Sequence, residues 1–76
     1  MKEIVEFVAR SVVDHPEAVQ VEEEQDGDHI IYHLYVADDD MGKVIGKQGR
    51  IANAMRAILK VAAARNDVYA SLEIGD

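Results

Sequence analysis

Apolar residues recur with helical spacing at the start of the chain. Positions three and four apart are apolar between residues 2 and 14, which predicts an amphipathic helix. Pro16 disfavours helical geometry at the residue before it, so we expect this helix to end near Asp14. The face expected to meet the core comprises Ile4, Val5, Phe7, Val8, Ser11 and Val12.

The next two segments alternate with the two-residue period of strands. Residues 17–25 place Val19 and Val21 on one side, and residues 29–37 place two different sets on their two faces. The sequence Gln25-Asp26-Gly27-Asp28 between them predicts a tight hairpin turn. The core-facing set of the second strand is Ile30, Tyr32, Leu34 and Val36, whereas the opposite set is His29, Ile31, His33 and Tyr35.

The second half of the chain predicts a broken helix and a last strand. Residues 40–45 form a short helix, residues 50–65 a longer one, and residues 68–74 alternate as a strand. Asp38-Asp39-Asp40 is expected to cap the short helix rather than to bind a metal ion. The apolar stripe of the long helix is expected to contain Ile51, Ala54, Met55, Ile58, Val61 and Ala62.

This order of elements predicts an α+β fold. The first two strands pair as a hairpin, and the last strand, reached through helices, lies parallel to the second. Helices then cover one face of a three-stranded mixed sheet. A chain of 76 residues makes one domain, here spanning residues 1–76.

Composition narrows the class of function. So short a chain is not expected to build a large cleft. Its only serines, Ser11 and Ser71, lie beside no plausible catalytic base. We therefore expect that the protein is not an enzyme and has no cofactor. There is no cysteine, and the three histidines lack a convincing ligand spacing. No apolar run is long enough to span a bilayer and the first residues do not resemble a signal peptide, so a cytoplasmic protein is expected.

Charge is distributed very unevenly along the chain. The net charge is −7, yet residues 41–66 contain no Asp or Glu and six of the eight Lys and Arg residues. A basic segment on an otherwise acidic body is typical of a local phosphate-binding site. An ordinary basic helix would give the same pattern, so charge alone does not decide between them.

The centre of this basic segment is Gly46-Lys47-Gln48-Gly49, between two predicted helices. The spacing of Gly42, Gly46 and Gly49 fits neither a Walker A loop nor a dinucleotide fingerprint. Glycines let a backbone turn sharply and approach a sugar-phosphate chain, and the following helix points its unpaired N–H groups toward a phosphate. The loop is therefore predicted to bind nucleic-acid backbone.

The segment from Val44 to Ile51 resembles the signature of KH domains. The element order is similar to the type II KH fold, and the whole chain resembles the small bacterial RNA-binding proteins of the KhpA (YlqC-like) family. Gln48 departs mildly from the pattern, because glycine or a small polar residue is common there. The resemblance implies single-stranded RNA binding, an RNA-chaperone role and a link to cell elongation and division. The implied RNA-binding residues are Lys43, Val44, Ile45, Gly46, Lys47, Gln48, Gly49 and Arg50.

The resemblance also implies a partner chain. Family members are described as homodimers and as partners of a larger KH-containing protein, KhpB (Jag or EloR). No aromatic residue lies between Met41 and Val68, so a lone domain is expected to bind RNA weakly and to gain affinity by pairing. Two surfaces could pair: the outer sheet face with Ile31, Tyr35 and Tyr69, and, slightly favoured, the long helix with Ala57, Ala62, Ala63 and Ala64. A protein-interaction adaptor, in which RNA contact is secondary, is the alternative function.

Overall fold

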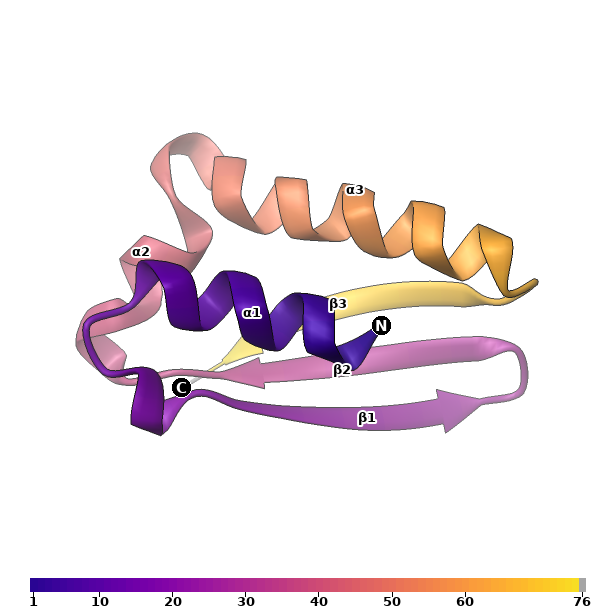
Figure 1. Cartoon of the computed structure of the whole chain (residues 1–76), viewed down its shortest axis with the longest axis horizontal. Coiled ribbons are helices and arrows are strands. Elements are labelled where there is room, and N and C mark those ends of the chain that lie inside the picture. Colours follow the sequence, from indigo (N-terminus) through magenta and orange to yellow (C-terminus); the bar gives the residue numbers. More distant parts are fainter. Residues whose placement is uncertain (76) are drawn as a thin grey trace.

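The computed structural model describes residues 1–75 and has the predicted order of elements (Figure 1). Short 3₁₀ turns precede β1, α2 and α3, at Pro16–Ala18, Asp38–Asp40 and Lys47–Gly49. The helices are α1 (Lys2–Val12), α2 (Met41–Ile45) and α3 (Arg50–Arg65), and the strands are β1 (Gln20–Asp26), β2 (His29–Tyr35) and β3 (Tyr69–Gly75).

The three strands form one mixed sheet in the order β1-β2-β3. β1 pairs with β2 in antiparallel register across a two-residue turn, with Asp26 opposite His29. β2 pairs with β3 in parallel, with Tyr32 beside Leu72. Helices α1 and α3 lie over the same face of the sheet, and the opposite face is left uncovered (Figure 1). The predicted α+β fold with a three-stranded mixed sheet is confirmed.

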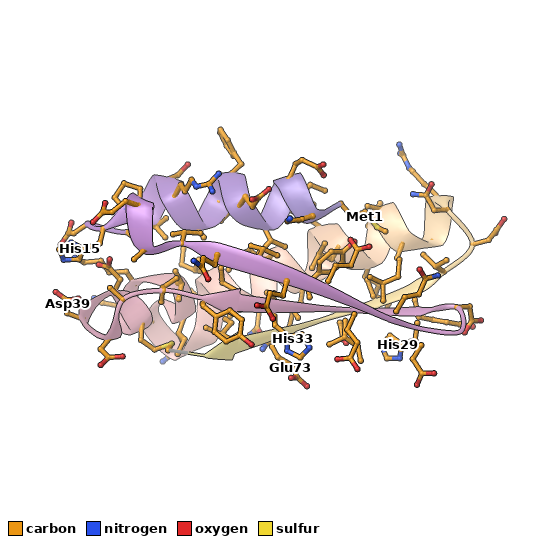
Figure 2. The ribbon with its side chains drawn as sticks, turned by 90° about the horizontal axis from the view of Figure 1, so that it is seen from below. Met1, His15, His29, His33, Asp39 and Glu73 are labelled. Atoms are coloured by element: carbon orange, nitrogen blue, oxygen red, sulfur yellow. The ribbon has the colours of Figure 1, made fainter. Side chains whose placement is uncertain are left out.

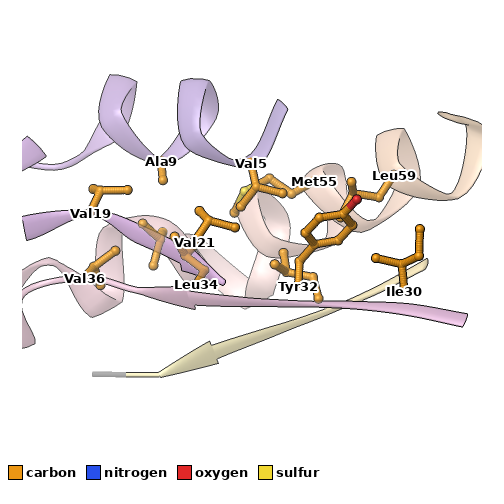
Figure 3. Close-up of a cluster of buried hydrophobic side chains, with 12 residues drawn as sticks. Val5, Ala9, Val19, Val21, Ile30, Tyr32, Leu34, Val36, Met55 and Leu59 are labelled. Carbon is orange, nitrogen blue, oxygen red and sulfur yellow. The ribbon is translucent and has the colours of Figure 1, made fainter. Parts of the chain in front are cut away.

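The core fills the space between the helices and this sheet face (Figure 3). The predicted face of β2 is correct, because Ile30, Tyr32, Leu34 and Val36 are all buried. Tyr32 is the largest buried side chain; burial, together with the carboxylate of Glu23, raises its pKa to about 12. From above, α1 contributes Val5 and Ala9, whereas α3 contributes Ala52, Met55, Leu59 and Ala63.

Both long helices are rotated from the predicted orientation. In α1, the predicted face is correct for Val5, which is buried, and for Val8 and Val12, which pack against the core. Phe7 is 74% exposed and Ser11 is exposed, and Ala9 takes their expected place in the core. In α3, the predicted stripe is correct for Met55 and for Ile51, which packs against the core. Ile58, Val61 and Ala54 face outward instead. Apolar residues occupy more than one face of α3, so the helical period alone did not decide which face packs on the sheet.

The connection from α1 to β1 also differs from the prediction. The strand expected at residues 17–25 begins only at Gln20, because Pro16 starts a 3₁₀ turn instead. Asp40, the N-cap residue of α2, does not form the predicted cap: its side chain makes no capping hydrogen bond, and its carboxylate points elsewhere. Fully buried, it accepts hydrogen bonds from the backbone N–H groups of Asp14 (3.0 Å) and His15 (2.9 Å).

Two opposing effects act on the pKa of the Asp40 carboxyl, and burial is the one that acts to raise it. The two backbone N–H donors, with the neighbouring charges of His15 and Lys43, outweigh burial and hold that pKa below its usual range. Asp40 therefore stays ionised and fastens the end of α1 to the start of α2. This contact fixes the position of the helix that leads into the glycine loop.

Candidate nucleic-acid interface

The glycine loop begins at a position that only glycine can occupy. Gly46 ends α2 with φ 77° and ψ 174°, a conformation that is essentially restricted to glycine. A Cβ at this position would lie 2.6 Å from Ile51 Cγ1 and 3.0 Å from the Ile51 backbone N. The loop and the first turn of α3 are thus packed against each other, and the chain reverses direction within a few residues.

Two further loop residues have a positive φ. Gln48 has φ 56° and Gly49 has φ 75°, and Gly49 is the residue that precedes α3. Gln48 occupies this region with a side chain, at a cost of roughly 1 kcal/mol that glycine would avoid. Its exposed amide therefore stands outward on a backbone that turns beneath it.

Positive charge surrounds the loop. The side chains of Lys47 and Arg50 are exposed on either side of Gly49. No side chain caps the N-terminus of α3, so its first N–H groups are directed toward the loop together with the positive end of the helix dipole. Four of the predicted site residues, Lys47, Gln48, Gly49 and Arg50, are thereby brought together on one basic surface.

The three predicted residues before the loop have other positions. Val44 is fully buried and packs in the core, so its side chain does not line the surface. Ile45 is partly exposed beside the loop. Lys43 is held by the carboxylate of Asp14 and lies 3.6 Å from that of Asp40, and its hydrogen bond to Asp14 raises the pKa of its ammonium. Lys43 is therefore already paired with acids, unlike Lys47.

A groove of about 670 Å³ lies between α3 and the edge strand β3. Figure 1 shows α3 running from the loop along β3 to the opposite end of the molecule. Most of the groove surface is apolar, and its two acidic residues, Asp28 and Asp67, belong to turns: the β1–β2 turn and the turn after α3. The other lining residues are Arg56, Lys60, Ala63, Ala64, Val68, Tyr69, Ala70, Ser71 and Leu72.

Arg56 is a groove residue that the sequence did not single out. Its Nη2 donates to the backbone carbonyl of Leu72 at 3.3 Å, and its Nη1 donates to Asn53 Oδ1 at 3.4 Å. Both acceptors are neutral, so neither compensates the charge of the guanidinium. Its place in the basic segment was the only signal in the sequence, because the carbonyl that orients it lies 16 residues further along the chain.

A second apolar surface lies on another face of α3. Ile58 and Val61 are 47% and 58% exposed, and with Ala57, Ala62 and Arg65 they line a shallow hollow of about 460 Å³. The stripe of alanines predicted to be a partner surface is thereby divided. Ala57 and Ala62 belong to this surface, whereas Ala63 is in the core and Ala64 lines the groove.

The uncovered sheet face has the opposite chemistry. The three strands contain no Lys or Arg. On the open face His33 bridges Glu24 at 3.0 Å and Glu73 at 3.3 Å (Figure 2). Ile31 and Tyr35 are half-buried there, and Tyr69 is exposed at its edge. A polyanion is repelled by such a surface, whereas the cations of residues 41–66 lie on α2, the loop and α3.

One group of possible metal ligands lies at the other end of α2. His15, Asp39 and Asp40 bring ligand atoms within 4.8 Å of one another. However, Asp40 is occupied by two backbone N–H groups, and His15 Nε2 lies 3.2 Å from Asp39. These internal contacts account for the cluster, so we assign it no ligand.

The family model for the KH domain of KhpA/KhpB matches residues 2–74. The chain belongs to this family. A protein from Clostridium perfringens with the name "RNA-binding protein KhpA" is 51% identical over 74 residues, which cover 97% of this chain and 99% of that protein. Proteins with the same name from Halalkalibacterium halodurans and Chlamydia pneumoniae are each 47% identical, over 76 and 74 residues.

These matches span 95–100% of the relatives' lengths and 97–100% of this chain. No solved structure gave a significant match. The element order therefore corresponds to a KH domain across its whole length, and the resemblance seen in the sequence is confirmed. Within residues 1–75, no helix is long and apolar enough to cross a membrane.

Proposed function

We propose that this KH domain binds single-stranded RNA without catalysing a reaction, with the loop Gly46–Gly49 on the sugar-phosphate backbone and the α3–β3 groove on the bases. The observation that carries the proposal is the geometry of Gly46, which leaves no room for a Cβ beside Ile51. A loop so tightly turned, with exposed cations on both sides, suits close approach of a phosphate. The relatives named as RNA-binding proteins support the same function.

The proposed roles follow from position. Lys47 and Arg50 contribute charge, Gln48 contributes neutral donors, and the first N–H groups of α3 point at the phosphate. Partly exposed Ile45 can contact a sugar or base near the loop, whereas Val44 supports the floor from within the core. Lys43 contributes through the overall field, because its ammonium is paired with Asp14.

A single domain should bind weakly. The loop has no aromatic residue on which a base could stack, and Tyr69 is the one aromatic among the residues that line the groove, so stacking, worth about 1–3 kcal/mol per base, is limited. Two linked domains raise the effective concentration of the second binding event and so recover affinity. Weak, backbone-directed binding of single strands in the cytoplasm also suits an RNA-chaperone role.

The exposed apolar surface of α3 is the proposed site of pairing. Ile58 and Val61 lie one helical turn apart beside the small side chains of Ala57 and Ala62, which allow close approach of a second helix. The groove occupies a different face of α3, so pairing and RNA binding are compatible. A second copy of this chain is the expected partner, and the KH domain of a larger KhpB-like protein is the alternative one.

The test of the loop is a double substitution. Lys47→Asp with Gln48→Asp places two carboxylates on the exposed loop and should reduce affinity for a labelled single-stranded octanucleotide at least tenfold, as measured by fluorescence anisotropy at low salt. Lys2→Asp with Gln20→Asp is the matched control, because it makes the same change in net charge away from the loop. The control should lose less than about threefold.

The outcomes separate two functions. Equal affinity of the loop variant and the parent would show that the loop is not the site. If the parent does not bind any octanucleotide at low salt, the adaptor function is favoured instead, with the exposed surface of α3 as its binding site. Circular dichroism of both variants verifies that the fold is intact.

A further inference from the structure

The α3–β3 groove contains one feature that its proposed role in holding bases does not explain. Its walls are mostly small and apolar, which suits any flat base. Arg56 is an exposed side chain that lines the groove beside Lys60, and its guanidinium donates hydrogen bonds to the carbonyl of Leu72 and the amide oxygen of Asn53. A cation that served only to attract phosphate would not need to be oriented from two sides.

The acidic turn residues argue against phosphate inside the groove. Asp28 and Asp67 offset the charges of Arg56 and Lys60 among the lining residues, so the groove has no net positive charge with which to hold a phosphate. The RNA backbone is therefore kept at the loop, and the space beside Arg56 is left for a base. In this position the guanidinium meets the edge of a base rather than a charged oxygen.

A fixed guanidinium selects among bases by hydrogen-bond pattern. It carries only donors, arranged in a planar fork that matches two neighbouring acceptors. Guanine offers N7 and O6 side by side, and cytosine offers N3 and O2, since both edges of an unpaired base are accessible in single-stranded RNA. Adenine and uracil offer no pair of adjacent acceptors, because a donor group adjoins each acceptor on these edges.

We propose that Arg56 makes the groove selective for a base with two adjacent acceptors, guanine or cytosine, over adenine and uracil. This inference rests on the proposed RNA binding and adds specificity to it. Leu72 and Asn53 act as positioning residues, since they hold two of the guanidinium N–H donors and aim the remaining ones into the groove.

The test compares fluorescein-labelled RNA octamers of sequence (GU)₄, (CU)₄, (AU)₄ and U₈ by anisotropy. At least one of the first two should bind about tenfold more tightly than the last two, since a bidentate contact discriminates by this order. Replacing guanine with 7-deazaguanine removes one acceptor and should abolish a guanine preference. Inosine retains both acceptors and should preserve the guanine preference. Tight binding of (CU)₄ but not of (GU)₄ identifies cytosine as the selected base.

The decisive variant is Arg56→Lys, which keeps the charge and removes the fork. It should lose the preference while its affinity for U₈ stays within about twofold of the parent. Arg65→Lys is the matched control on the same helix and should retain the preference, because Arg65 lies on the other surface of α3. Unchanged melting of both variants verifies that the fold is intact.

Three results would overturn the inference. Equal binding of all four octamers shows that the groove does not select, and a preference retained by Arg56→Lys shows that another residue selects. In the third result, Arg56→Gln weakens the binding of all octamers equally and reduces the slope of log K against log salt concentration by about 0.7. Arg56 is then a phosphate contact. Failure to bind any octamer instead refutes the RNA-binding function itself, so the two failures are distinguishable.

Discussion

Substitution of Gly46 by alanine tests how tightly the loop is packed. The added Cβ meets two obstacles at once: a φ of 77° with ψ 174°, and atoms of Ile51 at 2.6 and 3.0 Å. The nearer atom belongs to a side chain, but the other is the backbone N of α3, which cannot move without displacing the helix. Gly49→Ala is the matched control, because its Cβ would meet nothing closer than Asn53 Nδ2 at 3.5 Å.

The expected costs differ by several-fold. For Gly46→Ala the backbone conformation costs about 1–3 kcal/mol and the overlap about 1–3 kcal/mol, against a gain of roughly 0.4–1 kcal/mol from a stiffer unfolded chain. The net destabilisation is about 3 kcal/mol. For Gly49→Ala the left-handed conformation costs about 1–2 kcal/mol with the same offset, which leaves about 1 kcal/mol or less.

Urea denaturation followed by circular dichroism measures both values. A 76-residue domain has a free energy of unfolding of roughly 4–11 kcal/mol, so the loss at Gly46 is a large share of it. With a slope near 1 kcal/mol per molar urea, the midpoint should fall by about 3 M for Gly46→Ala and by about 1 M or less for Gly49→Ala. A Gly46→Ala midpoint within 1 M of the parent, or equal to that of Gly49→Ala, would refute the packing argument.

Two further predictions concern the helix surface and the α1–β1 connection. Ile58→Asp should shift the protein from dimer to monomer in sedimentation at micromolar concentration, whereas Phe7→Asp, at a more exposed apolar residue on α1, should not. A parent that sediments as a monomer contradicts the proposed pairing. The hydrogen bond with Asp39 raises the pKa of His15 in the folded protein. The ion pair between protonated His15 and Asp39 therefore stabilises the fold fully below about pH 6.5, the pKa of an unfolded histidine, and this stabilisation is lost as the pH rises through the pKa of folded His15. The urea midpoint should therefore decline above pH 6.5, and Asp39→Asn should reduce this decline; an identical decline in Asp39→Asn excludes the pair as its source.

The sequence predicted the fold well because each strand has a clear inner face. Ile30, Tyr32, Leu34 and Val36 alternate without ambiguity, and Asp26-Gly27-Asp28 sets the hairpin register. The orientation of α3 could not be predicted in the same way. Its sequence presents two overlapping apolar stripes, one through Leu59 and one through Ile58, and only packing against the sheet decides between them.

The candidate site was also only partly predictable from the sequence. The loop could be identified because glycine spacing and local charge are properties of neighbouring residues. Roles that depend on distant partners could not be identified: Asp40 receives its donors from Asp14 and His15, and Arg56 is oriented by Leu72. Val44 illustrates the limit most clearly, since adjacency to the loop suggested contact with RNA but the helix turns its side chain inward.

The absence of Lys and Arg from all three strands has a kinetic consequence. Because the strands carry no cation while residues 41–66 carry six, positive and negative charge are separated across the molecule, which gives it an electric dipole. In the field of an RNA strand this dipole experiences a torque that turns the α2–α3 side toward the strand before contact. A larger fraction of encounters with RNA therefore leads to binding. The association rate constant should fall steeply with added salt, because salt shortens the range of the electric field.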